Sequence, residues 1–519
     1  MRPVFLIGFP AAGKTTVGRL AAAALGRAFV DLDDEVLTRT GSSAAVLVAA
    51  DEADFRKHEA TALRALIDGD ARDTIVATGG GAASHGDNLA RMKSAGLVVT
   101  LAVGLDHALH RAAGGGRPLL ARPRAELEAL YARRAPVYRR AHAALATEGR
   151  RPEAVAEALV ALIEHADLLV HAHPWVCLGE RSYPIVVDDG PLASALAPFR
   201  RAGVLIADRN LAPWIEPVRA ALGDVAVELV EPGEASKSIA TYGELAARLV
   251  ARGLDRASTI YALGGGVVGD LVGFVAATLY RGVAVVHLPT SLVAMTDSAI
   301  GGKTAVDLPA GKNLIGAFHQ PRAVIAHLPT LTTLPPRERR AGFGELWKYA
   351  LLDGEALWSA TEALAPWART DAAPPPAARA VIEQAAAIKA AIVSVDEREQ
   401  SGLRLLLNLG HTVGHAIEAA ADWDLLHGEC VGLGLIAAAR ISHRLGFADA
   451  DLEPRVTGAL AATGLPTELA PWLTPATLGR IAVDKKRAHG QLRFIACASL
   501  GDCRVVELSP AAFADLLRP

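Results

Sequence analysis

Cysteine, an excess of one charge and long apolar runs are all scarce in this 519-residue chain, and each absence excludes a class of protein. Four cysteines without a C-x-x-C pair exclude a disulfide framework and suit a reducing compartment. Lys and Arg total 53 against 56 Asp and Glu, which argues against a nucleic-acid binder, because such proteins usually carry a basic excess. No uncharged apolar run approaches the roughly 18 residues of a membrane span, and the N-terminal apolar run is too short for a signal peptide. We therefore expect a soluble, cytoplasmic protein with neither a nucleic-acid nor a membrane partner.

Apolar residues are abundant, at 51% against 21% charged residues, so a large core can form, and the length indicates about three domains. In residues 1–165, short apolar runs alternate with alanine-rich helical patterns, which is typical of a small α/β domain with a parallel sheet. The expected strands are Val4–Ile7, Ala28–Val30, Thr74–Ala77 and Leu97–Val103, and the expected helices include Thr15–Leu25 and Phe55–Ile67.

Beyond a predicted linker at residues 166–179, a second α/β series occupies residues 180–327, and residues 328–519 are mainly helical in pattern. Its expected strands are Tyr183–Val187, Gly203–Ala207, Val225–Val230, Thr259–Leu263 and Val283–Leu288. The expected helices of the last part include Ala377–Val395, His411–Ala421 and Gly428–Leu445, and a proline-rich loop precedes the first of them. The fold class is therefore α/β throughout residues 1–327, followed by a mainly α-helical domain.

A phosphate-binding motif lies near the N-terminus. Residues Gly8–Thr15 match G-x-x-x-x-G-K-[ST] and stand between a strand and a helix. The glycines let backbone N–H groups surround a polyphosphate at the helix N-terminus. Lys14 is expected to reach the β and γ phosphates, and the Thr15 hydroxyl to bind Mg²⁺.

Three further features follow this motif in the first domain. The acidic run Asp31–Asp34 follows the second strand, where a solvated helix cap is the alternative interpretation. The glycines Gly79–Gly81 follow another strand and indicate close approach of a ligand or of backbone. Arg117 ends a glycine run, as expected of a closing lid that brings a cation to a transferring phosphoryl group.

Residues 1–165 resemble shikimate kinase through six motifs that follow one another in the family order. These are GFPAAGKTTVGRLAA, DLDDEV, Phe55-Arg56, ATGGGA, RPLLA and RRAPVYRR. The resemblance implies a P-loop kinase domain that phosphorylates the shikimate 3-hydroxyl with ATP and Mg²⁺. The spacing from Asp33 to Arg56 is one residue shorter than expected for the family, and the lid is slightly short. A gluconate-type kinase is the alternative, since it shares the P-loop but should lack the carboxylate-binding arginines.

The same resemblance assigns roles residue by residue, and Lys14, Asp33 and Arg117 are the catalytic group. Asp33 binds the shikimate hydroxyls and accepts the proton of the attacking one, and arginines bind the carboxylate. The implied ATP contacts are Gly13, Lys14, Thr15, Thr16 and Arg117, the Mg²⁺ ligands are Thr15 and Asp31, and the shikimate contacts are Asp33, Arg56, Gly79, Gly80, Gly81 and Arg134.

A second glycine loop, Gly264–Gly269, contains G-x-G-x-x-G directly after a predicted strand. This context allows a dinucleotide pyrophosphate to lie against bare backbone, and a tight turn without a ligand is the alternative. Lys303 and Lys312 follow among Gly, Thr and Asn residues, which is more typical of binding a phosphorylated substrate than of solvated surface lysines.

Three histidines have metal-ligand spacing. His411 and His415 stand four residues apart on a predicted helix, and His427 follows in Leu426-His427-Gly428. Spacing alone makes both helical histidines ligands and leaves the carboxylate ligand open. The alternative is that all three histidines pack in the core or lie on the surface.

From about Trp175 onward the chain resembles 3-dehydroquinate synthase, through LGERSYPI, GGGVVGD, PTSLVAMTDSAIGGKT, GKNLIGAFHQP, GELWKYA, LNLGHTVGHAIE, LHGECVGLG and DKK. The resemblance implies a Rossmann-like NAD-binding domain (180–327) and a helical metal-binding domain (328–519). It implies conversion of 3-deoxy-D-arabino-heptulosonate 7-phosphate to 3-dehydroquinate and phosphate with NAD⁺ and Zn²⁺ or Co²⁺. It also implies that Glu345, His411 and His427 bind the metal while His415 faces the substrate, contrary to the spacing argument.

Further site residues are implied in the same way, and Asp297, Lys303, Lys348 and His415 are the catalytic group. The implied NAD contacts are Asp208, Asn210, Glu234, Lys237, Gly265, Gly266, Val267, Asp270, Thr290 and Ser291. The implied contacts with the heptulosonate phosphate are Arg281, Asp297, Lys303, Lys312, Asn313, Lys348, Lys389, Arg404, Asn408, His415 and one of Lys485 and Lys486. The sequence departs from the family pattern at Gly344 and at Leu346-Trp347. It also departs at His327, a position where an acidic residue is expected.

Together the two resemblances predict a fusion of two enzymes of one pathway with small-molecule substrates. The steps are not consecutive, so direct channelling is not expected, and a homodimer through the synthase half is implied by the family. Three alternatives stay open for the second half. They are a related cyclase acting on sedoheptulose 7-phosphate, a polyol dehydrogenase, and a non-catalytic regulatory relic, although a relic should have lost residues such as Glu345 or His411.

Overall fold

Two compact units make up the chain in the computed structural model, which describes residues 2–69, 71–113, 118–167, 173–400, 402–421, 424–484 and 491–517. Met1–Ser182 and Ala390–Val395 form the first unit, and Tyr183–Lys389 and Asp396–Pro519 form the second. A helix able to cross a membrane is not found in the described part of the chain. The predicted boundary at residue 327, inside the second unit, stays a prediction.

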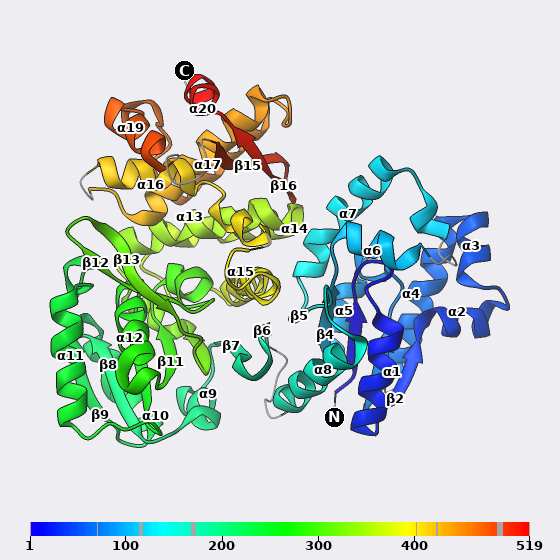
Figure 1. The fold of residues 1–519 in the computed structure, drawn as a ribbon, viewed down its shortest axis with the longest axis horizontal. Coiled ribbons are helices and arrows are strands. Elements are labelled where there is room, and N and C mark those ends of the chain that lie inside the picture. The colour runs from blue at the N-terminus through cyan, green and yellow to red at the C-terminus, as the bar shows by residue number, and fades with distance from the viewer. Residues whose placement is uncertain are drawn as a thin grey trace. The chain divides into compact units, whose positions relative to one another are not determined.

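A parallel sheet covered by helices forms the first unit (Figure 1). Its strands lie in the order β2-β3-β1-β4-β5, and the central strand pairs in parallel with both neighbours, Val4 lying opposite Ile75 and Leu97. All four residues of this strand are buried, as its uninterrupted apolar run predicts. The elements are β1 (Val4–Ile7), α1 (Lys14–Leu25), β2 (Ala28–Asp31), α2 (Leu32–Thr40), α3 (Ala44–Ala50), α4 (Glu52–Asp68), β3 (Thr74–Ala77), α5 (Asn88–Ala95), β4 (Leu97–Ala102), α6 (Leu105–Ala112), α7 (Arg124–Arg139), β5 (Ala143–Ala146), α8 (Pro152–Ala166) and β6 (Trp175–Val176).

The second unit begins with another parallel sheet, in which β7, β14, β11, β10, β8 and β9 are neighbours in this order. Its elements are β7 (Tyr183–Asp188), α9 (Leu192–Leu196), β8 (Gly203–Asp208), α10 (Ala212–Leu222), β9 (Ala226–Val230), α11 (Ile239–Ala251), β10 (Thr259–Gly264), α12 (Gly266–Thr278), β11 (Ala284–Pro289), β12 (Lys303–Leu308), β13 (Gly311–Phe318) and β14 (Ala323–His327). The sheet predicted from the apolar runs is confirmed as a Rossmann-like α/β arrangement.

Alternate residues of each strand serve two separate cores. On β10, Ile260 and Ala262 face the core that α11 and α12 cover, whereas Tyr261 and Leu263 face the core that α9 and α10 cover. After β8 the chain moves outward to β9 and then returns, so that β10 lies on the other side of β8. At such a change of direction, ligands of parallel sheets bind outside the carboxyl ends of the strands, which here are those of β8 and β10.

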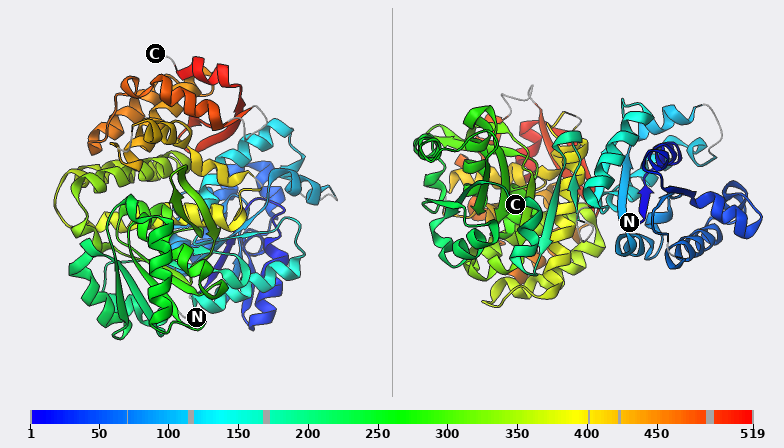
Figure 2. Two further views of the ribbon diagram at one scale, coloured as in Figure 1. Left: turned by 60° about the vertical axis from the view of Figure 1, so that its left-hand side comes forward. Right: turned by 90° about the horizontal axis from the view of Figure 1, so that it is seen from below.

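The remainder of the second unit is mainly helical, as predicted. Its elements are α13 (Pro336–Asp353), α14 (Glu355–Leu364), α15 (Pro376–Val395, of which Ala390–Val395 belong to the first unit), α16 (His411–Ala420), α17 (His427–Arg444), α18 (Leu452–Thr463), α19 (Pro475–Asp484), β15 (Leu492–Ser499), β16 (Asp502–Leu508) and α20 (Pro510–Leu517). The antiparallel pairs β12–β13 and β15–β16 were not expected from the sequence. Strand β15 lies beside α17 (Figure 1 and Figure 2), so this hairpin is stabilised by the helical layer rather than by a sheet.

Candidate active sites

The phosphate-binding motif of the first unit joins the central strand β1 to α1. Gly8 and Gly13 both have positive φ, of 140° and 94°, and a Cβ on Gly8 would lie 2.5 Å from the Leu101 carbonyl oxygen. The buried Lys14 ammonium donates to the carbonyl oxygens of Gly8, at 2.9 Å, and Phe9, at 3.3 Å. The loop therefore curls around its own lysine at the N-terminus of α1, which is the arrangement that binds a polyphosphate.

A hydroxyl and a carboxylate meet beside this loop. Thr15 Oγ1 donates to Asp31 Oδ2 at 2.8 Å, and Asp31 Oδ1 accepts from the backbone N–H of Asp33 at 3.1 Å and so caps α2. Hard oxygen donors of this kind, next to a phosphate site, fit Mg²⁺. Thr16, another predicted ATP contact, lies on α1 and is exposed.

The glycines after β3 form a wall on which four charged side chains converge. A Cβ on Gly79 would lie 2.1 Å from Glu59 Oε1 and 3.3 Å from Asp33 Oδ1. A Cβ on Gly81 would lie 2.5 Å from Arg56 Cζ and 2.8 Å from Arg134 Nη2. These glycines keep the wall bare, so that carboxylates on one side and guanidinium groups on the other reach one small space.

One charged group in this space, the Arg134 guanidinium, lacks part of its hydrogen bonding among the described residues. Arg134 is 6% exposed, its Nη1 has no hydrogen-bond partner among the described residues, and burial lowers its pKa. Reduced hydration raises the pKa of Asp33, and the Asp31 carboxylate raises it further. Arg56 binds Glu59 Oε2 at 2.7 Å and Glu52 Oε1 at 3.3 Å. Two guanidinium groups beside one aspartate are suited to a small ligand with a carboxylate and hydroxyl groups.

Sequence reasoning missed two members of this site. Glu59 is fully buried and pairs with Arg56 one helical turn earlier, and this i, i+3 spacing could have indicated the pair. Tyr138 donates from its hydroxyl to the Gly80 carbonyl oxygen at 2.6 Å and so supports the glycine wall. The predicted lid residue Arg117 lies outside the described residues.

In the second unit, the predicted NAD contacts follow successive strands of the sheet. Asp208 ends β8, Glu234 follows β9, Gly265 follows β10 and Thr290 follows β11. Because these strands are parallel, the side chains share one edge. Of the other predicted contacts, the N–H of Asn210 donates to Asp208 Oδ1 at 2.8 Å, Ser291 Oγ is 3.3 Å from where a Cβ of Gly265 would lie, and Val267 lies in the first turn of α12.

Lys237 and Asp270 form a largely buried ion pair at this edge, with 2.6 Å between Nζ and Oδ2. Burial opposes the charge of Lys237, but Asp270 outweighs it and raises the pKa of the lysine. A Cβ on Gly266 would lie 3.1 Å from Ser298 Oγ, a buried hydroxyl without a hydrogen-bond partner among the described residues. The bare glycine loop and the unpartnered hydroxyl fit a dinucleotide at the N-terminus of α12.

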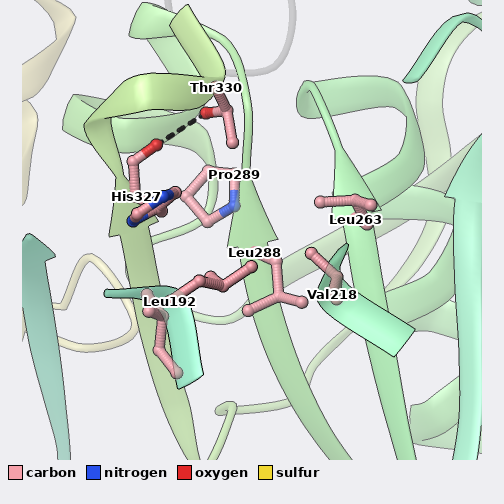
Figure 3. Close-up of a pocket in the computed structure, with 8 residues that line it drawn as sticks. Leu192, Val218, Leu263, Leu288, Pro289, His327 and Thr330 are labelled. Carbon is pink, nitrogen blue, oxygen red and sulfur yellow. Dashed lines mark hydrogen bonds between the residues drawn. The ribbon is translucent and has the colours of Figure 1, made fainter. Parts of the chain in front are cut away.

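A small apolar pocket, of about 10 Å³, lies at the same edge, at the ends of β10, β11 and β14 (Figure 3). Its lining is Leu192, Val218, Leu263, Leu288, Pro289, Ile325, His327 and Thr330. Thr330 Oγ1 donates to the His327 carbonyl oxygen at 2.7 Å, and Trp214 packs edge-on against the His327 ring at 5.8 Å. Burial lowers the pKa of His327, so its ring is neutral at pH 7. His327 thus completes an apolar wall where an acidic residue was expected.

The three predicted histidines converge at the helix N-termini of α16 and α17. One ring nitrogen from each of His411, His415 and His427 lies within 4.8 Å of the others. Glu345, which is fully buried on α13, approaches two of them, since its Oε1 is 3.3 Å from His411 Nε2 and 3.1 Å from His427 Nε2. The contacts of Glu345 are therefore with His411 and His427, and His415 is exposed at the edge of the cluster.

Glycines allow the three helices to approach this closely. A Cβ on Gly428 would lie 1.8 Å from the Ala341 carbonyl oxygen, and one on Gly344 would lie 2.0 Å from the Gly428 oxygen. Between α16 and α17, a Cβ on Gly434 would lie 1.8 Å from the Gly410 oxygen. Gly344, a departure from the family pattern, is thus a point of backbone contact between α13 and α17.

Hydrogen bonds orient the two rings that contact Glu345. His411 Nδ1 lies 3.1 Å from the Leu409 carbonyl oxygen, and His427 Nδ1 lies 3.2 Å from Glu418 Oε2. Although burial opposes it, Glu345 and Glu418 raise the pKa of His427 to about 10. Two oriented imidazoles and one carboxylate fit a divalent metal such as Zn²⁺ with a position open to substrate. Glu418 was not predicted, although it lies on the same helix as His411.

Asp297 connects the metal-binding cluster to two lysines. Its carboxylate accepts from Lys348 Nζ at 3.1 Å, from Lys389 Nζ at 2.8 Å and from the Tyr349 hydroxyl, which sequence reasoning missed. Lys348 Nζ is also 2.5 Å from Glu345 Oε2. Burial opposes ionisation of Asp297, but the two lysines hold its pKa well below the usual range. Burial lowers the pKa of Lys389 to about 8.

The other predicted phosphate contacts lie at different distances from this network. Lys312 Nζ is 3.0 Å from Glu418 Oε1 and 3.5 Å from Glu234 Oε1, so it joins the metal-binding cluster to the NAD edge. Arg404 Nη2 lies 3.5 Å from the Gly301 oxygen, and Lys303 Nζ lies 2.5 Å from Glu399. Three further predicted residues make no hydrogen bond or ion pair with this network among the described residues, and Lys485 and Lys486 lie outside them. The three are the exposed Arg281, Asn313, whose N–H donates to Asp307, and the half-buried Asn408 at the end of a 3₁₀ helix.

These two sites define a P-loop phosphotransferase and an enzyme with a dinucleotide edge facing a metal-binding cluster. The family model of shikimate kinase matches residues 10–164, and those of the 3-dehydroquinate synthase N-terminal and C-terminal domains match residues 227–341 and 342–487. The chain belongs to the 3-dehydroquinate synthase family and carries a shikimate kinase domain at its N-terminus. It is therefore an enzyme with both activities, as the sequence predicted.

Individual relatives agree with this assignment. The 3-dehydroquinate synthase of Acidithiobacillus ferrooxidans is 45% identical over 357 residues, which are 66% of this chain and 96% of that protein. The 3-dehydroquinate synthase of Halorhodospira halophila is 44% identical over 66% of this chain and 98% of that protein.

Among solved structures, two synthases of other names are similar in fold. A 2-deoxy-scyllo-inosose synthase with carbaglucose-6-phosphate, NAD⁺ and Co²⁺ has a TM-score of 0.58 at 27% identity and covers 66% of this chain and 98% of its own. The 2-epi-5-epi-valiolone synthase of Streptomyces hygroscopicus, with NAD⁺ and Zn²⁺, has a TM-score of 0.59 at 27% identity and covers 64% and 95%.

Proposed function

We propose that the first unit transfers the γ-phosphoryl group of ATP to the 3-hydroxyl of shikimate. The observation that carries this proposal is the pair Arg56 and Arg134 facing Asp33 across the glycine wall. Shikimate has one carboxylate and neighbouring hydroxyls, and these are the groups that two guanidinium groups and one aspartate bind. A gluconate-type kinase shares the P-loop but should lack this set of carboxylate-binding arginines, so the arginine pair favours shikimate.

Each residue of the kinase site has a physical task in this proposal. Lys14 and the loop N–H groups hold the phosphates, and Thr15 and Asp31 hold Mg²⁺, which neutralises phosphate charge when bound. Asp33 binds the hydroxyl and accepts its proton, for which its raised pKa makes it a better base. Arg117 is assigned as the lid cation on the family resemblance alone.

We propose that the second unit converts 3-deoxy-D-arabino-heptulosonate 7-phosphate to 3-dehydroquinate and phosphate, using NAD⁺ and Zn²⁺ or Co²⁺. Glu345, His411 and His427 would hold the metal, and the edge from Asp208 to Ser291 would hold NAD⁺. When bound, the metal lowers the pKa of a substrate hydroxyl and the nicotinamide takes up and returns a hydride.

The chain's own residues bind and orient the substrate in this reaction. Lys348 and Lys389, held by Asp297, supply buried positive charge for the phosphate, and Lys303, Lys312 and Arg404 add charge at the rim of the site. His415 is free of Glu345 and lies next to the two metal-facing rings, so it is assigned to substrate contact and proton transfer. Further substrate contacts are assigned on the family resemblance alone. They are Arg281, Asn313, Asn408 and one of Lys485 and Lys486.

A cyclase acting on sedoheptulose 7-phosphate is the second candidate, because the two similar solved structures are named as synthases other than 3-dehydroquinate synthase. The curated relatives at higher identity and the kinase domain in the same chain favour the acidic heptulosonate. Arg404, 2% exposed, supplies a cation for the carboxylate that sedoheptulose lacks.

The deciding experiment measures phosphate release from each of the two sugars by the purified full-length chain with NAD⁺, with and without a chelator. Release from the heptulosonate alone, abolished by the chelator and by Glu345→Gln, is expected. Release from sedoheptulose 7-phosphate alone would move the unit to the other cyclases. Shikimate phosphorylation by the same Glu345→Gln sample is the control for intact protein.

We further propose a homodimer through the second unit, located in the cytoplasm. Strand β13 exposes Leu314, Ile315 and Phe318 to 36–48%, which is unusual for apolar side chains and fits burial against a second copy. The four free cysteines fit a reducing compartment. Light scattering of the full chain is expected to give twice the monomer mass, and Ile315→Lys is expected to halve it.

A further inference from the structure

Two of the four cysteines lie opposite each other in the hairpin β15–β16. All four are free thiols, and in this antiparallel pair Cys497 is the register partner of Cys503. The other two, Cys177 and Cys430, are buried elsewhere in the chain. Neither Cys497 nor Cys503 belongs to the kinase or synthase sites proposed above.

The backbone around Cys497 shows which kind of cross-strand pair this is. Its N–H donates to Ser442 Oγ of α17 at 2.8 Å and therefore points away from β16. In an antiparallel sheet such a residue belongs to a non-hydrogen-bonded pair, whose Cα atoms are about 4.5 Å apart and whose side chains approach closely. That separation lies within the range of about 4.4–6.8 Å in which a disulfide closes without backbone movement.

The thiols already interact and differ in accessibility. A hydrogen bond with the Cys503 thiol, together with burial, raises the pKa of Cys497 well above its ordinary value. Cys497 is 1% exposed, whereas Cys503 is half-buried and donates to the Leu351 carbonyl oxygen at 3.7 Å. An oxidant therefore reaches Cys503 first, with the second thiol in place behind it.

We propose that Cys497 and Cys503 form a peroxide-sensitive dithiol that closes reversibly to a cross-strand disulfide. The Cys503 sulfur attacks the peroxide, whose O–O bond breaks, giving a sulfenic acid and one molecule of water. The Cys497 sulfur then attacks the Cys503 sulfur, the S–S bond forms, and the sulfenic oxygen leaves as a second water. The two thiols lose two electrons and two protons in total, and a dithiol reductant returns them.

Trypsin makes the proposal directly testable, because it cleaves after Arg493 and Arg504 and leaves both cysteines in the peptide Phe494–Arg504. The full-length chain is treated with hydrogen peroxide, alkylated with iodoacetamide under denaturing conditions, digested and weighed. The peptide is expected to be lighter than its dithiol form by two hydrogen atoms and free of alkyl groups. Dithiothreitol added after the peroxide and before the alkylation is expected to restore both alkylation sites. Peptides with Cys177 and Cys430 are expected to stay alkylated and serve as internal controls.

Variants assign the order of the two steps. In Cys497→Ser the sulfenic acid on Cys503 lacks its partner and is expected to react with dimedone, whereas Cys503→Ser is expected to leave Cys497 as an alkylatable thiol. Cys503 is half-buried, so its substitution keeps the test available if Cys497→Ser does not fold. Two alkyl groups on the peptide after peroxide, or sulfinic acid at Cys503 of the unaltered chain, would overturn the proposal.

Discussion

At the scale of single residues, Lys389 is a buried cation held by one carboxylate. Its ammonium donates both to the side chain and to the carbonyl oxygen of Asp297, at 2.8 Å each. Burial lowers the pKa of this lysine to about 8, because Asp297 offsets the loss of hydration only in part. The charge offered to a substrate phosphate therefore depends on pH near neutrality.

We expect the KM for the heptulosonate phosphate to rise as the pH increases through about 8, because Lys389 is charged below its pKa and neutral above it. Phosphate-release kinetics on both sides of this pH measure the effect. In Lys389→Arg the guanidinium stays charged, so the alkaline rise is expected to disappear. An equal rise in that variant would assign the effect to another group.

Arg134 permits a test of the kinase site at the same scale. Its buried guanidinium lies beside Gly81, and its Nη1 has no hydrogen-bond partner among the described residues. Loss of a charge-assisted hydrogen bond costs about 1.5–3 kcal/mol. Arg134→Gln is therefore expected to raise the KM for shikimate about 10- to 100-fold with little change in the KM for ATP. Phosphate release by the second unit of the same sample is the control, and a matching loss there would indicate misfolding instead.

At the scale of elements, the proposed metal site depends on three helices touching through glycine. Gly344 and Gly428 let α13 and α17 approach until backbone meets backbone, and Gly434 does the same between α17 and α16. Only then does Glu345 Oε1 come within 3.3 Å of His411 Nε2 and 3.1 Å of His427 Nε2. The donor atoms thus come from helix packing, and a single methyl group at a contact would separate them.

Gly428→Ala is expected to lower metal content, measured by inductively coupled plasma mass spectrometry, at least tenfold, since its Cβ would lie 1.8 Å from the Ala341 oxygen. The matched control is Gly458→Ala on α18, where a Cβ has no heavy atom within 4 Å. That control is expected to keep its metal and to stabilise the chain by up to about 1 kcal/mol, because alanine favours helix more than glycine does. Full metal content in Gly428→Ala would show that the helices can separate without loss of the site.

At the scale of the whole molecule, one chain joins two proposed metal sites of different chemistry. Thr15 and Asp31 offer hard oxygen atoms, whereas Glu345, His411 and His427 offer two nitrogens and one carboxylate. Oxygen donors favour Mg²⁺, and imidazoles favour Zn²⁺ or Co²⁺. A ligand for soft metals should therefore distinguish the two activities in one sample.

With excess Mg²⁺ present, 1,10-phenanthroline is expected to reduce phosphate release by the second unit more than tenfold and to leave shikimate phosphorylation within twofold. Coupled assays of both activities on the same preparation measure this, and added Zn²⁺ is expected to restore the first. Equal loss of both activities would contradict the assignment of separate metals.

Much of the architecture was predictable, because it depends on neighbours in the chain. The strands Val4–Ile7 and Thr74–Ala77 have the predicted bounds, and α16 and α17 differ from prediction by one residue at one or both ends. The hairpin β15–β16 was not predicted, since its strands are stabilised by α17 rather than by a pattern of their own. Glu59 was missed although its partner Arg56 is only three residues away, because its burial depends on packing against Gly79, which is distant in sequence.

The amino-acid sequence by itself determined the order of motifs, the P-loop between strand and helix, and the spacing of His411, His415 and His427, because these follow from backbone geometry over a few residues. Only the tertiary structure decided that Glu345 meets His427, 82 residues later, rather than His415. It also decided that Cys497 faces Cys503 and that Lys312 joins the NAD edge to Glu418. These contacts between residues distant in sequence depend on how closely whole helices and strands pack. The packing distance is set by glycine contacts between helices and by the register between strands.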